Sequence, residues 1–141
     1  MSAVELSAAA LDVARANGER LALAVEWLAG DWWQPLAGRT FDLVLANPPY
    51  VAPGDPHLAA LRHEPALALV APDRGLGAIE RIVAGAGAHL QRGGWLLLEH
   101  GFDQAPAVQA CLRAAGFADV RTATDLAGRP RCSGGCWPGG R

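Results

Sequence analysis

The sequence predicts an α/β fold built on a sheet of mainly parallel strands. Short apolar runs alternate with longer segments of helical periodicity, and several of these runs end in a polar residue. Two of the runs are nearly or wholly apolar, namely Phe41–Ala46, which contains only Asp42 as a polar residue, and Trp95–Leu98. Alternation of this kind is typical of parallel sheets, and unbroken apolar strands are typical of sheets covered by helices on both faces.

The first part of the chain predicts three strands and one helix. Residues 1–6 form a short strand, and Ser7 stands where the N-cap of a helix over 8–17 belongs. Residues 24–28 predict the second strand and residues 41–46 the third, which two prolines bring to an end. We expect helices to cover both faces of the third strand.

The second part predicts two helices and two further strands. Apolar residues at helical spacing predict a helix over 76–90, followed by a buried strand over 95–99. A helix over 104–115 then ends at Gly116, and 119–123 form a final strand. Because the carboxyl ends of parallel strands meet at one edge of a sheet, we expect ligands to bind there.

The chain is long enough for one domain. Its 141 residues, 51% of them hydrophobic, can form a single core. We place this domain at 1–128. Residues 129–141 are rich in Gly, Pro and Cys, so we expect them to form a flexible tail.

Charge and cysteine content exclude several classes of function. A net charge of −2 gives no basic surface for nucleic acid, and the longest apolar runs fall far short of the ~20 residues that cross a bilayer. The three cysteines are an odd number, which indicates free thiols and a cytoplasmic protein. Cys132 and Cys136 are spaced too widely for half of a zinc site, so we expect loop thiols and no metal.

The most informative segment is Asn47-Pro48-Pro49-Tyr50. Proline disfavours helix in the residue before it, fixes its own φ and lacks a backbone donor, so the turn is stiff and rich in acceptors. The side-chain oxygen of Asn47 and the carbonyl of Pro48 can accept hydrogen bonds from an NH2 group. With the ring of Tyr50 against its plane, an amide or aromatic amine would have its nitrogen aimed at an electrophile.

This turn, at the end of a buried strand, resembles the substrate motif of class I amino-methyltransferases. Further segments occur in the same order as in one family of that class, namely Asp55-Pro-His-Leu58, Glu64-Pro65, Asp73-Arg-Gly-Leu76 and Leu96-Leu-Leu-Glu-His-Gly101. Together they resemble the glutamine methyltransferases of peptide-chain release factors, the HemK/PrmC family. The resemblance implies a Rossmann-like sheet and methyl transfer from S-adenosylmethionine to a glutamine side-chain amide in a release factor.

The resemblance also implies a set of residues that bind the cofactor. Glu5 matches the acid that accepts hydrogen bonds from the ribose hydroxyls of S-adenosylmethionine. Asp31 and Trp32 match an acid and an aromatic residue near the adenine, and Asn47 is assigned to the cofactor as well as to the substrate. For Glu5 and Trp32 a solvated strand-end acid and a packing indole are the alternatives.

On the substrate side, the resemblance assigns the amide pocket to the Asn-Pro-Pro-Tyr turn. Asn47, Pro48, Pro49 and Tyr50 are the substrate-binding residues, and Asn47, Pro48 and Tyr50 are the catalytic candidates. Residues 99–100 match a family segment that we expect to support the cleft.

Compared with the family, the sequence lacks the first strand, its glycine-rich turn and the N-terminal helical domain. In the family the first strand lies between the strands that correspond to Val4 and Phe41, so we expect both to lack a neighbour. Met1 is then an internal or misassigned start, or the sequence is a fragment. Two alternatives to release factor methylation stay open: N-methylation of an exocyclic amine in nucleic acid, and an inactive fragment.

Overall fold

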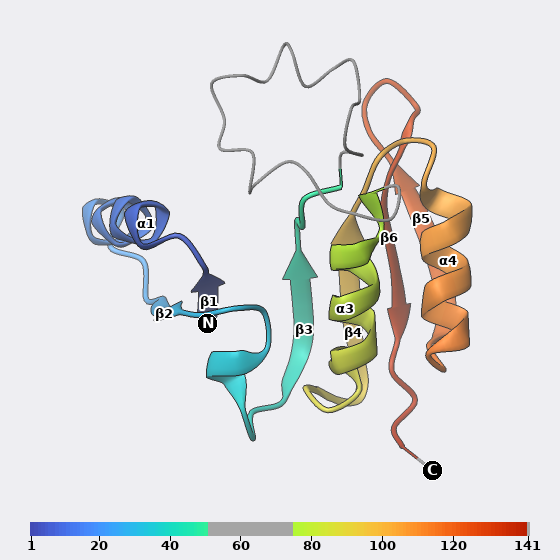
Figure 1. Cartoon of the computed structure of the whole chain (residues 1–141), viewed down its shortest axis with the longest axis horizontal. Helices are drawn as coiled ribbons and strands as arrows, with labels where there is room; N and C mark the ends of the chain where they lie inside the picture. The colour runs from blue at the N-terminus through green and yellow to red at the C-terminus, as the bar shows by residue number, and fades with distance from the viewer. Residues whose placement is uncertain (51–74, 141) are drawn as a thin grey trace. The chain divides into compact units, whose positions relative to one another are not determined.

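The computed structural model describes residues 1–50 and 75–140 (Figure 1). The chain divides into two compact units, Met1–Arg39 and Thr40–Arg141, and each is described by itself. The segments at 55–58 and 64–65, which contribute to the family resemblance, lie outside the described residues. None of the described helices is both long and apolar enough to cross a membrane.

The first unit contains two parallel strands joined by a helix. Its elements are β1 (Ser2–Glu5), α1 (Ala8–Arg20), β2 (Glu26–Ala29) and the short 3₁₀ helix η1 (Gln34–Leu36). The predicted N-cap is confirmed, because the Ser7 hydroxyl accepts a hydrogen bond from the Ala10 amide at 3.3 Å. In the sheet, Glu5 lies opposite Ala29, so both strands end at the same edge.

Helix α1 continues to Arg20 and does not end at Asn17 as predicted. Gly18, directly after the predicted end, is buried inside the helix. A Cβ at this position would lie 2.9 Å from Cζ2 of Trp27, which follows in β2. Gly18 is therefore required by close packing of the helix on the indole and does not terminate the helix.

The second unit is a four-stranded mixed sheet with two helices. Its elements are β3 (Phe41–Ala46), α3 (Gly77–Ala86), β4 (Leu90–Glu99), α4 (Ala105–Ala114), β5 (Ala118–Thr124) and β6 (Pro130–Cys136). The strand order is β3-β4-β6-β5, in which β3 and β4 are parallel and β6 is antiparallel to both of its neighbours. The sequence analysis predicted no strand at this position, so the antiparallel β6 is an addition to the predicted parallel strands.

Strand β6 also corrects the prediction of a flexible tail over 129–141. It pairs with β4 along one edge and β5 along the other, so it is an internal strand of the sheet. Ser133, Gly134 and Gly135 are buried in it. A Cβ at Gly134 would lie 2.3 Å from Cδ2 of Leu97, which explains why a strand in this position is built from glycine.

Helix α3 ends at Ala86, earlier than the predicted helix over 76–90. Leu90 begins β4 instead, and its Cα is the partner of Phe41 in β3. Gly93 has a φ of +84°, and a Cβ at Gly94 would lie 2.9 Å from the carbonyl oxygen of Phe41. These glycines permit an irregular first half of β4, which sequence periodicity does not distinguish from the end of a helix.

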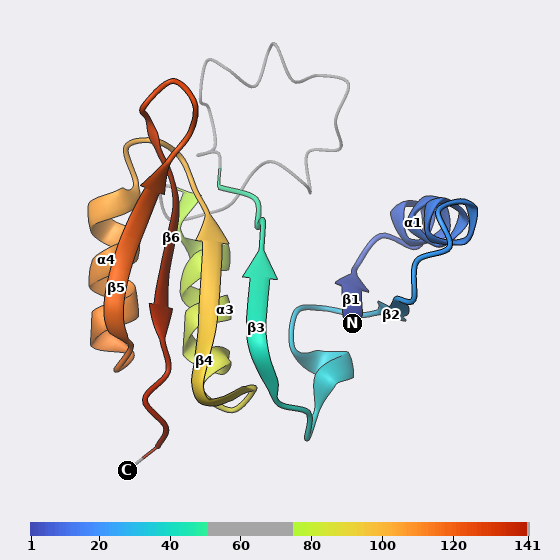
Figure 2. The same cartoon turned by 180° about the vertical axis from the view of Figure 1, so that it is seen from behind.

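Helices α3 and α4 lie on the same face of the four-stranded sheet, as Figures 1 and 2 show from opposite sides. The core forms between these helices and that face. Its buried side chains include Ile79, Ile82, Val83, Leu96, Leu98, Val108 and Leu112. Among the described helices of this unit, none covers the other face.

Strand β3 is consequently not buried on both faces, contrary to the prediction. Leu43 and Leu45 are 52% and 68% exposed. They lie opposite Trp95 and Leu97 of β4, on the face away from the helices. Within the described residues, β1 pairs with β2 alone and β3 with β4 alone, in line with the expectation that both strands lack a second neighbour.

The close packing of β6 on β4 predicts that one added methyl group at Gly134 destabilises the protein. In Gly134→Ala the new Cβ would overlap Leu97 and lie 2.5 Å from the backbone oxygen of Leu96, which cannot move without disturbing the sheet. We expect the free energy of unfolding in urea to fall by about 1–3 kcal/mol. Gly140→Ala is the control, since a Cβ at that position would have nothing within 4 Å, and a change below about 0.5 kcal/mol is expected. Equal stability of the two variants would show that β6 does not pack closely on β4 at Gly134.

The first unit predicts a pH-dependent ion pair. Arg39 and Ser2 donate hydrogen bonds to the Glu26 carboxylate, each at 2.9 Å, and Arg39 first, then Ser2, lowers the pKa of Glu26 from 4.5 to about 2. Because this pKa is lower in the folded state, the pair stabilises the unit above pH 4.5 and its contribution is lost as the pH falls through about 2.

We expect Arg39→Gln to raise the pKa of Glu26 toward 4.5, as measured by NMR titration of its side-chain carboxyl carbon. Arg20→Gln, which removes another exposed arginine of the same unit, should leave this titration unchanged. A Glu26 titration that is the same in Arg39→Gln and in the parent protein would show that Arg39 does not bind it in solution.

Candidate functional site

Two acidic residues lie at the carboxyl edge of the first unit. Glu5 ends β1, and Asp31 follows β2 after a single glycine. The backbone oxygen of Glu5 accepts a hydrogen bond from the Gly30 amide at 3.1 Å, which continues the pairing of the two strands beyond β2. The structure therefore brings Glu5 and Asp31 to one edge, where ligands bind in folds with parallel strands.

The Glu5 side chain is oriented by the start of α1. Its Oε1 accepts a hydrogen bond from the Ser7 amide at 2.8 Å. Within the described residues its Oε2 has no hydrogen-bond partner. A carboxylate held in this way can accept hydrogen bonds from hydroxyl groups of a ligand without first losing side-chain freedom.

Trp32 has an unusual backbone conformation for an aromatic residue. Its φ is +48°, in the left-handed region, which costs an L-residue about 1–2 kcal/mol. The turn is held on either side, because the Asp31 carbonyl accepts from Gln34 at 3.0 Å and the Trp33 carbonyl accepts from Leu36 at 2.9 Å. Strained backbone of this kind is found preferentially at binding sites. Trp33 belongs to the start of η1, so the two adjacent tryptophans differ in backbone conformation.

The Asn-Pro-Pro-Tyr turn follows β3 in the second unit. Pro48 is fully buried, Pro49 and Tyr50 are half-buried, and Asn47 is exposed. The Asn47 side chain makes no hydrogen bond to any of the described residues. The turn thus has a buried anchor at Pro48 and, directly before it, an amide that remains available to a ligand.

Asn47 lines a cavity of about 400 Å³ at the ends of three strands. The cavity wall comes from β3, the Asn47 turn, β4 and β6, and consists of Leu45, Ala46, Asn47, Leu97, Glu99, Arg131 and Cys132. It brings Asn47 together with Glu99 and with two residues that we had placed in a flexible tail. Since those two belong to β6, only recognition of this strand could have identified Arg131 and Cys132 from the sequence.

Tyr50 is oriented by Glu99. Its phenol donates a hydrogen bond to Oε1 of Glu99 at 3.0 Å. Burial and then the carboxylate of Glu99 raise the pKa of Tyr50 above its ordinary value of 10.0. Tyr50 is therefore protonated at neutral pH, and its ring is fixed beside the cavity as a hydrogen-bond donor.

His100, next to Glu99, belongs to a buried chain of polar side chains. Its Nδ1 donates to the Gly101 carbonyl at 2.8 Å, so its Nε2 accepts from the Ser133 hydroxyl, also at 2.8 Å. Ser133 in turn lies 2.7 Å from the Thr122 hydroxyl. Because His100 and Ser133 are fully buried, this chain fixes the strand ends to one another and is not available as a solvent-facing base.

The cysteines Cys132 and Cys136 lie in β6 and not in a loop, contrary to the prediction. Both are free thiols. Burial, and then the charge of Glu99, raise the pKa of the Cys132 thiol above its ordinary value of 9.0. The thiol at the cavity wall is thus protonated and a weak nucleophile.

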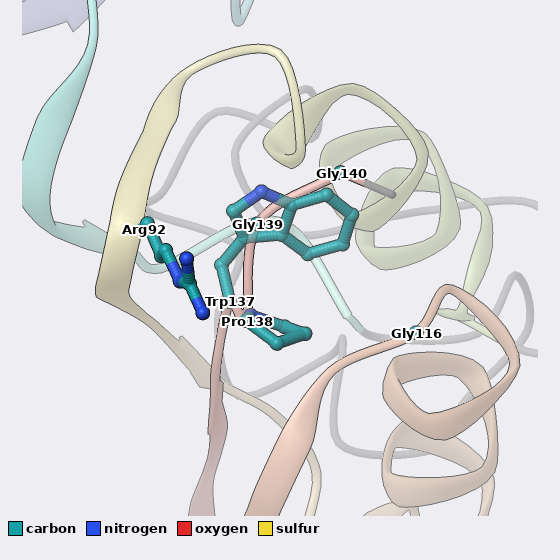
Figure 3. Close-up of a pocket in the computed structure, with 6 residues that line it drawn as sticks. All are labelled: Arg92, Gly116, Trp137, Pro138, Gly139 and Gly140. Carbon is teal, nitrogen blue, oxygen red and sulfur yellow. The ribbon is translucent and has the colours of Figure 1, made fainter.

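A second cavity, of about 560 Å³, lies near the beginning of β4 (Figure 3). It is lined by Arg92, Gly116, Trp137, Pro138, Gly139 and Gly140, none of which is a predicted site residue. The ring of Trp137 lies 5.3 Å from that of Phe117, centre to centre. This packing explains the position of Trp137 without a ligand. Because the second cavity contains no predicted site residue, the cavity near Asn47 is the candidate site.

Comparison with known proteins identifies several relatives by sequence. A family model described as the methyltransferase small domain matches residues 1–64. The release factor glutamine methyltransferase of Burkholderia pseudomallei is 52% identical over 146 residues, and that of Bordetella pertussis is 49% identical over 138 residues. These alignments cover 97% and 96% of this chain and 51% of each relative. The chain therefore spans about half the length of the curated relatives it matches.

Solved structures agree on the fold. A methyltransferase from Pyrococcus furiosus aligns with 98% of this chain and 62% of its own, with a TM-score of 0.70 and 21% identity. A ribosomal protein L11 methylase from Lactobacillus delbrueckii aligns with 94% of this chain and 55% of its own, with a TM-score of 0.64 and 15% identity. The predicted Rossmann-like methyltransferase fold is thus confirmed.

The contact between Tyr50 and Glu99 can be tested directly, because Tyr50 is the one tyrosine in the sequence. Glu99→Gln keeps a side-chain oxygen at the phenol but removes the negative charge, so we expect the raised pKa of Tyr50 to fall toward 10.0. Ultraviolet absorbance of the phenolate against pH measures it. Glu19→Gln, an exposed change in α1, should leave the titration unchanged. If both variants titrate like the parent protein, Glu99 does not bind the phenol.

Proposed function

We propose, on the premise that this chain is a homologue of the release factor glutamine methyltransferases, that it transfers a methyl group to the side-chain amide nitrogen of a glutamine in a release factor. The homology over 97% of the chain confirms the resemblance found in its sequence. The observation that carries the chemistry is the exposed Asn47 amide, which lines the cavity together with Glu99 and directly precedes the buried Pro48.

A glutamine amide is a poor nucleophile, because its nitrogen lone pair is delocalised into the carbonyl group. In the proposed complex the Asn47 side-chain oxygen and the Pro48 carbonyl accept the two N–H bonds of that amide. These two acceptors fix the plane and direction of the nitrogen, and the Tyr50 ring lies against the amide. Orientation of a reactant in this way is worth up to about 7 kcal/mol of barrier in favourable cases.

The first unit fits a nucleoside. Glu5 has a carboxylate oxygen for ribose hydroxyls, and Asp31 on the same edge can accept from an exocyclic amine, while the Trp32 indole can cover a base. We propose S-adenosylmethionine as the cofactor, with Glu5, Asp31 and Trp32 as the residues of this unit that bind it. When bound, it supplies an electrophilic methyl group. The amide nitrogen would accept this methyl group in exchange for one proton, which passes to solvent.

An exocyclic amine of a nucleic-acid base would satisfy the same two acceptors. Such a substrate also brings phosphates, which are usually neutralised by a surface rich in Arg and Lys. The net charge of −2 gives no such surface. The charge and the names of the sequence relatives therefore favour a protein substrate over nucleic acid.

The proposal predicts a loss of methylation in Asn47→Ala. Removing the acceptor leaves the substrate nitrogen free to rotate, so we expect the rate of release factor methylation to fall about 100-fold, measured by mass spectrometry. Asn17→Ala is the matched control, since Asn17 is exposed in α1. Methylation by Asn47→Ala at the rate of the control would contradict the role of this residue.

Binding of S-adenosylmethionine is measured separately by calorimetry, with the 141-residue chain and with a form extended to the length of its relatives. Heat of binding with both forms supports a complete cofactor site within this chain. Binding by the extended form alone supports the alternative that these residues are inactive by themselves. Binding by neither form would overturn the proposed cofactor.

A further inference from the structure

The two prolines of the Asn-Pro-Pro-Tyr turn leave one backbone rotation unrestricted. A proline ring fixes φ, and Pro49 restricts ψ of Pro48 to the extended region, but ψ of Pro49 stays free. The orientation of the turn, and with it the direction of the Pro48 carbonyl, therefore depends on where the chain is held after Pro49. A turn that must present this carbonyl to a substrate therefore requires an anchor after the prolines.

Gln104 provides a contact of this kind. Its Nε2 donates a hydrogen bond to the Tyr50 carbonyl at 3.0 Å. Its Oε1 accepts from the Gly101 amide at 2.7 Å, and its backbone amide donates to the Gly101 carbonyl at 3.0 Å. Both the oxygen and the nitrogen of the side-chain amide thus form hydrogen bonds. Gln104 joins the Asn-Pro-Pro-Tyr turn to the segment between β4 and α4.

Gly75 lies close to the same carbonyl and to its hydrogen bond with Gln104. Its φ is +80°, and a Cβ there would lie 2.0 Å from the Tyr50 oxygen and 2.7 Å from Nε2 of Gln104. A side chain at this position would displace the carbonyl from the Gln104 amide. Gly75 is buried, so the contact between Tyr50 and Gln104 requires a glycine at this position.

The anchor itself is fixed to the core. The Gly101 carbonyl accepts a hydrogen bond from Nδ1 of His100, and Nε2 of His100 is hydrogen-bonded to Ser133 of β6. His100 and Ser133 have no exposed surface. A continuous path of hydrogen bonds therefore leads from the middle of the sheet through Gln104 to Tyr50, whose phenol is held separately by Glu99.

We propose that Gln104 is a positioning residue, which fixes the backbone of Tyr50 and thereby the direction of the Asn47 and Pro48 acceptors. Its catalytic consequence rests on the proposed function, whereas its effect on Tyr50 does not. Gln104 touches neither of the acceptors. It acts by limiting the conformations that the turn can adopt.

The structural part is tested with ¹³C-labelled tyrosine, which gives signals from Tyr50 alone. Gln104→Glu keeps an oxygen for the Gly101 amide but places a carboxylate oxygen against the Tyr50 carbonyl, so we expect the ring signals to broaden or divide. Gln91→Glu is the matched control, because its Nε2 donates to Thr40 at 2.6 Å on the exposed surface.

Acidification provides a rescue that a folding defect would not show. Below the ordinary glutamate pKa of about 4.3, the protonated side chain of Gln104→Glu regains a donor for the Tyr50 carbonyl, and the ring signals should return to those of the parent protein. If Gln104→Glu does not fold, Gln104→Met, which has the length of Gln and neither hydrogen bond, takes its place without the rescue. Unchanged Tyr50 signals in a folded variant would overturn the proposal.

The kinetic part uses the form that methylates the release factor. We expect Gln104→Glu to lower kcat about 10–100-fold with an unchanged KM for S-adenosylmethionine, whereas Gln91→Glu keeps the parent rate. Altered Tyr50 signals with an unchanged kcat would overturn the positioning role. If the parent protein itself transfers no methyl group, the proposed function fails, and the Tyr50 signals then decide whether Gln104 holds the turn.

Discussion

The antiparallel insertion of β6 between β4 and β5 is the constraint on which the second unit depends. A strand can occupy this position only if its backbone approaches Leu96 and Leu97 closely, and Gly134 permits that approach. The insertion also sets the register that places Cys132 opposite Glu99 and Ser133 opposite Leu98. Consequently the wall of the cavity and the buried partner of His100 both come from the last strand of the sheet.

The Asn-Pro-Pro-Tyr turn benefits from this arrangement, although it lies far from β6 in the sequence. Glu99 is the last residue of β4 and His100 follows it directly, and successive residues of an extended chain point to opposite faces. Glu99 therefore faces the cavity and holds the Tyr50 phenol, while His100 is buried and hydrogen-bonded to Ser133. One dipeptide thus connects the candidate site to the core, which gives a physical reason for two polar residues at the end of an apolar strand.

Much of this organisation could be predicted from local sequence, because local interactions determine it. The Ser7 cap, the strand before Asn47 and the helix before Gly116 each have a signal within a few residues. Strand β6 has no such signal, because its Pro and Gly residues have low strand propensity and only their tertiary neighbours make them suitable. Arg131 and Cys132 were missed for the same reason, as was the exposure of Leu43 and Leu45, which depends on which face the helices cover.

The stiffness of the site has a consequence for the proposed reaction. Interactions that bind the substrate and the transition state equally lower KM without raising kcat, so affinity alone does not accelerate methyl transfer. A planar amide reacts only when its nitrogen is aligned with the methyl group, and such geometry must be held within about 0.5 Å. Two prolines, a buried anchor at Pro48 and separate contacts to both ends of Tyr50 restrict the acceptors before the substrate arrives. The energy of ordering the turn is thus supplied by folding, and the binding energy of the glutamine remains available for its alignment.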